Sequence, residues 1–383
     1  MQNLRKFVAP EIVFGSGALS LAARYAVNFG ARNPMIVTDE GVAKAGWVDM
    51  LSNELSEEGL NPKIFAAVSQ NPRDFQASEG ASFYRENKCD VILALGGGSP
   101  MDCAKAVGIL STNERGVRDF EGVDNVEVPG PPLICIPTTA GSSADVSQFS
   151  IINNTDLRKK FAIISKTMVP DVALIDPDTT FTMDPYLTAC TGMDALVHAV
   201  EAAVSTASSP ITDLHAFEAI RLICAHLPLV MNDPKNAEHR EKMMFASMQA
   251  GLAFSNASLG AVHAMAHSLG GLLDIPHGEC NALLLRSVVE FNYSSAPERY
   301  RLVASAMNIP VDKLSSSGIA SALAEKIESL REEVGITGSL SSRGMEEAFI
   351  AQLAENALSD PCMVTNPRIP VLTEIREVFR NAL

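Results

Sequence analysis

The first half of the chain alternates short runs of β-forming residues with stretches of helical composition. The runs are MIVTD (35–39), KIFAAV (63–68), VILALG (91–96), LICIPTT (133–139) and DVALIDP (171–177). Strands that alternate with helices favour a mainly parallel sheet covered on both faces, because each crossover helix returns over the sheet. Residues 1–183 are therefore predicted to form an α/β domain.

Two departures from this rhythm divide the chain further. Within 148–165, the runs FSII and FAII flank the turn-rich sequence NNTD, which predicts a hairpin. After Pro185 strand signals almost vanish, and long Ala/Leu/Met/Glu segments cover 188–206, 211–227, 238–254 and 259–270. We expect an all-α second domain over 184–383.

Length and composition limit the possible partners. At roughly 150 residues per domain, 383 residues fit about two domains. The formal charge of −15 argues against nucleic acid or an anionic membrane as a partner. No run of about 18 apolar residues and no signal-peptide core is apparent, so we expect no membrane span. Seven scattered cysteines without a Cys-x-x-Cys motif indicate a reducing cytoplasm.

A glycine-rich turn follows the third run, in VILALGGGSPMDCAKAVGIL (91–110). Ser99 is predicted to cap a helix that begins at Pro100, with Asp102 completing a capping box. Glycines before a helix N-terminus form a ready anion site. The alternative is a tight turn that binds nothing. The segment matches neither G-x-G-x-x-G nor the P-loop.

Polar residues also follow two other strands. Asp39 ends its strand, where a carboxylate can accept both hydroxyls of an adenosine ribose and repel a 2′-phosphate. Its alternative role is a helix cap. The loop PTTAGSSADVS (137–147) supplies the hydroxyls of Thr138, Thr139, Ser142 and Ser147. Ligands of open α/β sheets bind beyond such strand ends, although an ordinary Gly/Ser loop is the alternative.

Histidines and one aspartate cluster in the second half. His263 and His267 share a helical face, and Gly270 with Gly271 is predicted to end that helix so that a loop returns His277. Upstream, Asp194 and His198 are also four residues apart. These five candidate ligands suit Fe²⁺ or Zn²⁺ rather than Mg²⁺ or Ca²⁺.

Not every histidine is a candidate ligand, and the HxxxH motif differs from that of metalloproteases. His215, His226 and His239 are interpreted as structural. Ala264 follows the first histidine of the HxxxH pair, where metalloproteases of the zincin type have glutamate.

Taken together, GGGSPMDCAK, PTTAG, TGMDALVHAVEA, AFSNASLGAVHAMAHSLGG and PHGECNALLL resemble the iron-dependent (group III) alcohol dehydrogenases, within the dehydroquinate-synthase-like superfamily. The resemblance runs from FVAPEIVFGSGAL to the late SDPC…TNPR segment. It implies a Rossmann-like NAD-binding domain, a helical metal-binding domain, NAD(P)-linked interconversion of alcohols and carbonyl compounds, one divalent metal per subunit, and a homodimer or larger homo-oligomer.

The resemblance also implies roles for individual residues. The metal ligands fall on Asp194, His198, His263 and His277, and an additional site histidine falls on His267. The cofactor contacts fall on Asp39, Asn71, Gly97, Gly98, Ser99, Asp102, Thr138, Thr139 and Lys160. The chain departs from the common pattern at Asp145, Ser268, Glu279, Cys280 and Arg286.

These elements predict a mechanism and leave alternatives open. The metal would act as a Lewis acid toward a small primary alcohol or diol, and NAD would take the hydride. His267 either relays the proton or only supports a metal ligand. Phe149 and Phe254 either wall the substrate pocket or pack in the core. The carboxylate of Asp39 predicts that the enzyme prefers NAD to NADP.

Two kinds of alternative function remain: a related enzyme, or a scaffold protein without catalytic activity. Glycerol dehydrogenases and dehydroquinate-synthase-like enzymes share the glycine-rich turn followed by the Asp102 and Lys105 pattern, so glycerol-dehydrogenase-like polyol oxidation is one alternative. Another is an enzyme that keeps NAD tightly bound and needs an external acceptor. A non-catalytic scaffold should have lost metal ligands or the glycine-rich turn.

Overall fold

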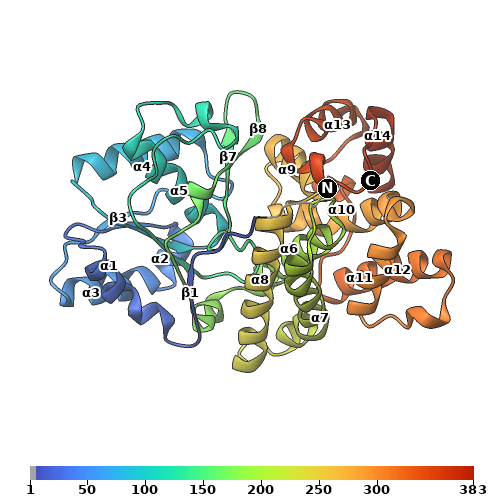
Figure 1. Cartoon of the computed structure of the whole chain (residues 1–383), viewed down its shortest axis with the longest axis horizontal. Helices are drawn as coiled ribbons and strands as arrows, with labels where there is room; N and C mark the ends of the chain where they lie inside the picture. Colours follow the sequence, from blue (N-terminus) through green and yellow to red (C-terminus); the bar gives the residue numbers. More distant parts are fainter. Residues whose placement is uncertain (1–5) are drawn as a thin grey trace. The chain divides into compact units, whose positions relative to one another are not determined.

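The structure, a computed structural model, describes residues 6–383 and forms two compact units (Figure 1). The α/β unit spans Val8–Met183, and the helical unit comprises Asp184–Leu383 together with Lys6 and Phe7. Phe7 accordingly belongs to the helical unit, where its ring stacks on that of His215 with centroids 5.6 Å apart. The predicted first domain began earlier, at residue 1.

The α/β unit is built on a six-stranded, all-parallel sheet with the strand order β1-β9-β6-β4-β2-β3. Its strands are β1 (Glu11–Phe14), β2 (Met35–Val37), β3 (Lys63–Phe65), β4 (Ile92–Gly96), β6 (Leu133–Pro137) and β9 (Val172–Ile175). Each of the five predicted runs contains one of them. The edge strand β1 was missed, because four residues with only partial burial carry almost no pattern.

Both faces of the sheet are covered by helices (Figure 1). The unit's helices are α1 (Ala22–Asn28), α2 (Glu40–Lys44), α3 (Trp47–Glu57), α4 (Asp74–Glu86) and α5 (Gly98–Thr112). Successive residues of β4 pack on opposite sides: Leu93 lies in the core under α1 and α3, and Ile92 in the core under α5. This two-sided burial explains why the strands are continuous apolar runs.

The predicted hairpin is present. Strands β7 (Phe149–Asn154) and β8 (Lys159–Ile164) pair antiparallel, and β8 also pairs with the short β5 (Gly122–Val123). Ile152 and Phe161 of the hairpin pack into a core with α4 and α5. The hairpin is therefore fixed to the helices on one side of the main sheet.

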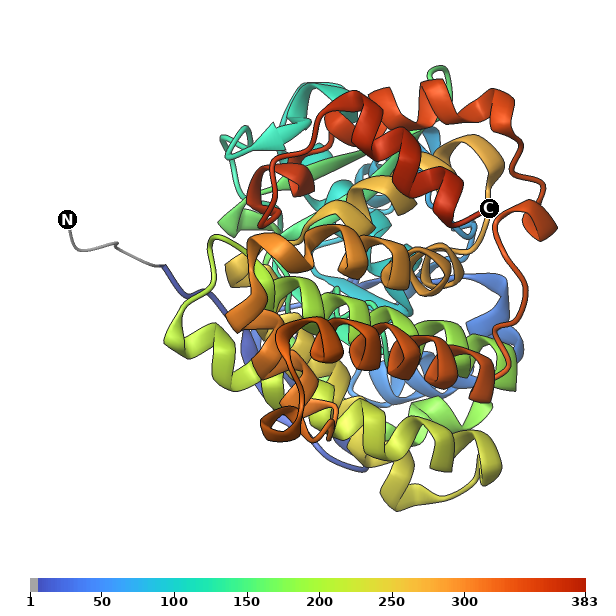
Figure 2. The same cartoon turned by 90° about the vertical axis from the view of Figure 1, so that its right-hand side faces the viewer.

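The helical unit contains nine α-helices among the described residues, and Figures 1 and 2 show the first three side by side. They are α6 (Pro185–Val204), α7 (Pro210–Asn232), α8 (Ala237–Ala257), α9 (Ala261–Leu273), α10 (His277–Asn292), α11 (Pro297–Ala306), α12 (Ser316–Glu333), α13 (Ile350–Leu358) and α14 (Leu372–Asn381). Short 3₁₀ turns connect several of them, including η9 (Pro361–Thr365).

One predicted helix end was wrong. Helix α9 continues through Gly270 and Gly271 and ends at Leu273, with Asp274 as its C-cap in the left-handed conformation (φ 55°). A glycine costs a packed helix only about 1 kcal/mol, which is not enough to end it. Helix α7 continues past Pro228 to Asn232.

Two helices, α6 and α7, are long and apolar enough to cross a membrane by length and composition alone. In α6, 89% of the most apolar window is buried inside the structure, and in α7 39% is buried. Core helices of soluble proteins pass the same test, so this signal is weak.

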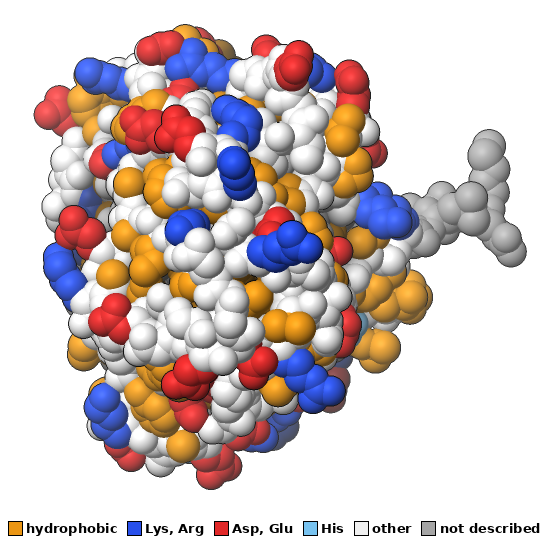
Figure 3. Space-filling model, turned by 90° about the vertical axis from the view of Figure 1, so that its left-hand side faces the viewer, with side chains coloured by type: hydrophobic (Ala, Val, Ile, Leu, Met, Phe, Trp, Pro, Cys, Tyr) orange, Lys and Arg blue, Asp and Glu red, His pale blue; other side chains and the backbone are white. Residues whose placement is uncertain are grey.

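Figure 3 shows acidic and basic side chains interspersed on one face of the molecule.

Candidate functional site

The glycine-rich turn joins β4 to α5 in a way that the sequence did not predict. Helix α5 begins at Gly98 with Gly97 as its N-cap, and no side chain caps it. The predicted capping box of Ser99 and Asp102 is therefore wrong: Ser99 lies inside the first turn. The reason is the conformation of Gly96, whose φ of 152° turns the chain early and brings Pro100 against it.

This turn lies against the hydroxyl-rich loop that follows β6. A Cβ atom on Gly97 would come within 3.1 Å of Thr139 Oγ1, and one on Gly98 within 2.9 Å of Ser142 Cβ. The backbone N–H of Thr138 donates to Gly96 O at 2.9 Å. The structure thus brings the predicted turn and the predicted hydroxyls together at the carboxyl ends of β4 and β6, where first-turn N–H groups have no intrahelical partner.

Asp39 stands at the same edge of the sheet, after β2, which pairs with β4. Its Oδ1 accepts the Val42 backbone N–H at 2.9 Å and caps α2. The alternative role as a helix cap is thus present. The hydrogen bond engages one carboxylate oxygen, which is compatible with a ribose contact through the other.

Asn71 and Lys160 are brought near one another by the hairpin. Asn71 is buried with a positive φ of 54°. The next residue, Pro72, accepts a 2.8 Å hydrogen bond from Asn153 N, and Asn153 pairs with Lys160 across the β7–β8 ladder. Asp102 lies in the second turn of α5, where its backbone carbonyl accepts from Ser150 Oγ at 2.8 Å.

Ser147 has a different environment from the other predicted hydroxyls. It is buried, and its carbonyl accepts the Lys105 ammonium at 2.8 Å, with its hydroxyl 3.2 Å away. Lys105 also donates to Phe149 O at 2.8 Å. Lys105 thereby fastens the loop to α5, and burial lowers its pKa. Burial raises the pKa of nearby Asp145 to about 6.

The predicted metal ligands come from three helices of the helical unit. Asp194 lies on α6, His263 on α9, and His277 is the first residue of α10. Asp194 Oδ1 is 3.8 Å from His263 Nε2 and 3.7 Å from His277 Nε2. One donor atom from each residue lies within 4.8 Å of the other two.

Gly278 explains how α10 comes so close to α6. A Cβ atom at this position would lie 2.3 Å from the backbone oxygen of Cys190, one turn before Asp194. Real Cβ atoms essentially never approach so closely. A glycine after His277 is therefore required for the two helices to bring His277 and Asp194 together.

His198, the fourth predicted ligand, adjoins this group through the ring of His263. Its ring stacks on that of His263 with centroids 4.6 Å apart, and on Phe254 at 4.2 Å. Phe254 thus contacts a predicted ligand, and it is buried. Phe149, the other predicted pocket wall, is a buried residue of β7 in the α/β unit.

Two charged or polar side chains that sequence reasoning missed adjoin the ligands. Glu201, one turn beyond His198, lies with its carboxylate 2.6 Å from His263 Nδ1. Asn281, one turn beyond His277, places its amide nitrogen 2.6 Å from Asp194 Oδ1. Their helical spacing from a predicted ligand was the signal that could have found them.

Electrostatics favour a neutral imidazole at His263. Burial, reinforced by neighbouring His198, lowers the His263 pKa well below its usual value. Burial also raises the pKa of Glu201 to about 7, although backbone N–H groups of Val262 and Gly260 oppose that rise. A neutral imidazole is the form that binds a metal.

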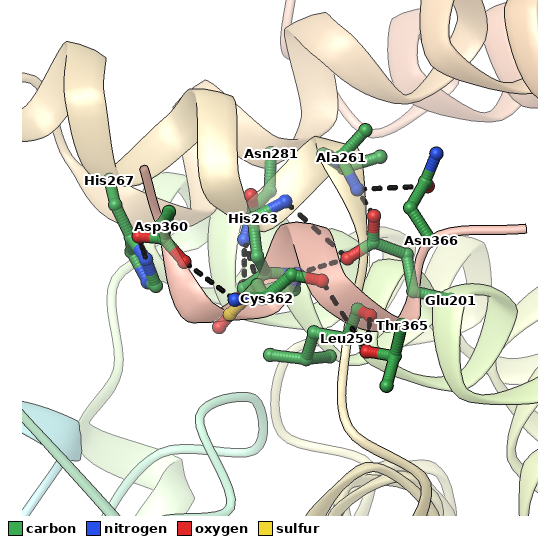
Figure 4. A network of polar contacts seen from close by, with 12 residues as sticks. Glu201, Leu259, Ala261, His263, His267, Asn281, Asp360, Cys362, Thr365 and Asn366 are labelled. Atoms are coloured by element: carbon green, nitrogen blue, oxygen red, sulfur yellow. Dashed lines mark hydrogen bonds and ion pairs between the residues drawn. The ribbon is translucent and has the colours of Figure 1, made fainter. Parts of the chain in front are cut away.

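His267 belongs to a second buried group, shown in Figure 4. Its Nδ1 lies 2.9 Å from Asp360 Oδ2, while the other Asp360 oxygen accepts the Cys362 backbone N–H at 2.8 Å. Burial would raise the Asp360 pKa, but His267 and the Cys362 N–H outweigh it and lower that pKa. Asp360 lies 93 residues beyond His267 and was not predicted.

The positions that depart from the family pattern have structural partners. Ser268 donates to Leu353 O at 3.0 Å and ties α9 to α13. Buried Glu279 accepts from Arg343 Nε at 2.5 Å. Arg286 pairs with Glu290 on the surface of α10.

The donor set fits a divalent transition metal. Metal–ligand distances of about 2.1 Å separate neighbouring donor atoms by roughly 3 to 3.5 Å, close to the separations around Asp194 Oδ1. The Asn281 Oδ1 atom is also buried without a hydrogen-bond partner in the described part of the chain. Imidazole and carboxylate donors together suit iron or zinc.

Comparisons with known proteins agree with this architecture. The family model described as "Iron-containing alcohol dehydrogenase" matches residues 9–177, and "Fe-containing alcohol dehydrogenase family, C-terminal" matches residues 188–383. The 1,3-propanediol dehydrogenase of Citrobacter freundii is 39% identical over 98% of both chains.

Two solved structures are similar along their whole length. A 1,3-propanediol oxidoreductase has a TM-score of 0.96 at 38% identity and covers 100% of both chains. The sulfoacetaldehyde reductase of Bifidobacterium kashiwanohense, solved in complex with NAD⁺, has a TM-score of 0.86 at 30% identity and covers 99% of both.

The chain therefore belongs to the iron-containing alcohol dehydrogenase family. Its activity is NAD-linked oxidoreduction of alcohols or diols and their carbonyl counterparts, with a metal-dependent centre of the family's type.

Proposed function

We propose that the chain oxidises a small primary alcohol or diol at a single metal centre formed by Asp194, His198, His263 and His277. The observation that carries this proposal is the convergence of Asp194, His263 and His277 from three helices, with donor atoms within 4.8 Å of one another. A divalent metal held there supplies Lewis acidity, which lowers the pKa of an alcohol hydroxyl. The protein's part is to hold the imidazoles and one carboxylate together, with Asp194 and His263 buried.

Iron is the proposed metal, and zinc is the alternative. The mixed nitrogen and oxygen donors accept both ions, and the Irving–Williams order favours Zn²⁺ at equal availability. The family's iron dependence supports Fe²⁺. Metal analysis of protein purified without oxygen, together with reconstitution of stripped protein, distinguishes the two.

The cofactor is proposed to bind along the carboxyl edge of the sheet. The Gly97–Ser99 turn and the first-turn N–H groups of α5 would hold its phosphates, with the hydroxyls of Thr138, Thr139 and Ser142 beside them. Asn71, Asp102 and Lys160 are retained as further contacts. Ser147 is bound by Lys105 in the core and is not proposed as a cofactor contact.

NAD is proposed over NADP because of Asp39. Its carboxylate would accept the ribose hydroxyls and repel a 2′-phosphate. NAD supplies the hydride acceptor for the reaction.

His267 is proposed to move the proton released from the substrate. Its Nδ1 faces the Asp360 carboxylate, which can only accept a hydrogen bond while ionised. His267 therefore donates through Nδ1 and presents Nε2 as the proton acceptor. The competing role is support of His277, whose ring stacks on that of His267 at 5.4 Å.

The substrate is proposed to be small and only partly polar. Phe254, which stacks on His198, would supply an apolar wall, and Phe149 is retained as a second candidate. The similarity to 1,3-propanediol dehydrogenases makes short diols the first compounds to test.

The deciding experiment measures NADH formation at 340 nm with short alcohols and diols, including 1,3-propanediol. Metal-stripped protein is assayed with and without Fe²⁺ under anaerobic conditions, and with Zn²⁺. Turnover that requires added metal supports the proposal. Metal binding without turnover, together with NAD released on heating, would instead favour a tightly bound cofactor and an external acceptor. Failure to bind metal would contradict the ligand set.

We also propose that the protein works in the cytoplasm as a homodimer or larger homo-oligomer. Support for the compartment comes from the seven cysteines, none of which forms a disulfide within the chain. Light scattering of the purified protein measures the assembly.

A further inference from the structure

Glu201 contacts both the backbone and the side chain at the start of α9 (Figure 4). Its Oε1 accepts the Val262 backbone N–H at 2.7 Å, and its Oε2 lies 2.6 Å from His263 Nδ1. The N-cap residue, Gly260, has no side chain to perform this capping. A buried carboxylate from α6 therefore caps the helix that carries His263 and touches the imidazole ring at the same time.

The opposite side of the His263 ring fixes where its hydrogen lies. The Asn281 amide nitrogen is 2.6 Å from Asp194 Oδ1, and the carboxylate accepts this hydrogen bond, so that atom is the NH₂ group and not the amide oxygen. The same nitrogen lies 3.1 Å from His263 Nε2. It also lies 3.2 Å from His277 Nε2. An amide nitrogen cannot accept a hydrogen bond, so a hydrogen on His263 Nε2 would face another donor, and the contact favours Nε2 as the acceptor.

A neutral imidazole has one hydrogen, so the hydrogen of His263 is on Nδ1 and points at Glu201. We propose that Glu201 is a positioning residue for the metal centre. It keeps His263 in the Nδ1–H tautomer, so that the Nε2 lone pair faces the donor atoms of Asp194 and His277. This inference rests on the proposed metal centre and adds a residue that the ligand set does not contain.

The variant Glu201→Gln tests the tautomer with almost no change in shape. The Gln oxygen must stay at Val262 N–H, because two donors would otherwise face each other. The NH₂ group then falls against His263 Nδ1 and donates to it. The hydrogen of His263 then favours Nε2, which must lose it before that nitrogen can bind a metal.

A matched control comes from the same helix end. Asn366 Oδ1 accepts the Ala261 backbone N–H at 3.1 Å, so Asn366→Ala also removes a cap of α9. It leaves the Glu201 contact with His263 in place. Any effect of a weakened helix start on metal binding will appear in both variants.

The experiment titrates metal-free protein with Co²⁺ and follows the visible absorption of the bound ion. We expect Glu201→Gln to weaken Co²⁺ binding by about 10- to 100-fold and to change the spectrum. Asn366→Ala should lower the melting temperature while keeping the wild-type spectrum and affinity. Equal losses in the two variants, or no loss in Glu201→Gln, would overturn the inference.

A second measurement does not depend on any variant at residue 201. The ¹⁵N shifts of labelled histidine in the metal-free wild type report which nitrogen of His263 carries hydrogen, with His263→Gln assigning the signal. An Nδ1–H resonance supports the inference, and an Nε2–H tautomer overturns it. If the wild type binds no Co²⁺ at all, the proposed metal centre is wrong, and the inference falls with it.

Discussion

His267 Nδ1 lies 2.9 Å from Asp360 Oδ2, and both side chains are buried in the helical unit. Variants of this pair distinguish the two roles considered for His267, which are proton relay and support of a metal ligand. If His267 relays a proton, His267→Gln should lower kcat by roughly 100-fold or more and leave Co²⁺ affinity unchanged. Steady-state kinetics and a Co²⁺ titration provide the measurements. The control is His239→Gln, because His239 lies on α8, which carries none of the predicted ligands. If His267→Gln also lowers the affinity for Co²⁺, His267 supports a metal ligand instead of relaying a proton.

Asp360→Asn should disturb the same step without removing the imidazole. Its oxygen must accept the Cys362 N–H, so its NH₂ group falls at His267 Nδ1 and places the histidine hydrogen on Nε2. We expect kcat to fall by roughly 100-fold and the pH profile of kcat to change. An unchanged profile would contradict the assignment of the proton to this pair.

Gly278→Ala should abolish metal binding in a folded protein. The added methyl group would meet the Cys190 backbone oxygen at 2.3 Å and push α10 away from α6. Gly192→Ala is the matched control on α6, because its methyl group meets the flexible Leu227 side chain instead of backbone. Bound metal per subunit and the far-ultraviolet circular dichroism of both variants give the answer. Full metal occupancy in Gly278→Ala would show that the close approach of the helices is not required.

Asp39 should decide the cofactor preference through its charge. Asp39→Asn keeps an oxygen for the Val42 N–H but removes the repulsion of a 2′-phosphate, whereas Asp39→Gly also removes the cap. Both variants should lower the ratio of kcat/KM with NAD to that with NADP, by about tenfold for each 1.4 kcal/mol of lost discrimination. A ratio that is unchanged in Asp39→Asn would mean that Asp39 serves only as a cap. Wild-type efficiency with NADP that equals or exceeds that with NAD would contradict the preference itself.

Asp74 should make the stability of the α/β unit depend on pH. Burial alone would raise its pKa, but hydrogen bonds from Arg118 and Thr155 outweigh burial and lower it. Its stabilising effect is therefore complete above the unfolded pKa of about 3.9 and is lost as the pH falls through the folded value.

We expect Asp74→Asn to cost about 2 kcal/mol at pH 7, measured by urea unfolding, and the cost to shrink below about pH 4. Asp156, whose side chain is 73% exposed, also pairs with Arg118, so Asp156→Asn should cost under about 1 kcal/mol. A cost of Asp74→Asn that does not change with pH would point to packing instead of charge.

The sequence predicted those parts of the fold that short segments determine. Five of the six sheet strands, the hairpin and the helical second half were recognisable because their patterns are local. The edge strand β1 was not, since its pairing with β9 joins positions 161 residues apart, as Glu11 and Val172 show. The start of α5 was misplaced because the backbone of Gly96, and not the capping preference of Ser99, determines where the helix begins.

In the candidate site, too, residues with a local pattern were predicted, and residues that only long-range packing brings there were not. The predicted ligands Asp194, His263 and His277 were recognisable by helical spacing and family motifs, and three helices bring them together. Asp360 had no local signal, because the packing of α13 and η9 on α9 brings it to His267. Its motif, SDPC, was noticed only as part of a family resemblance, which does not say what a residue contacts.

The residues proposed to bind metal all lie between positions 194 and 277, and those proposed to bind cofactor between positions 39 and 160, each set within its own compact unit. Metal and cofactor are thus proposed to be held by two separate compact units. A change of charge at Asp39 should therefore alter cofactor preference without touching any proposed metal ligand, since Asp39 and those ligands belong to different units.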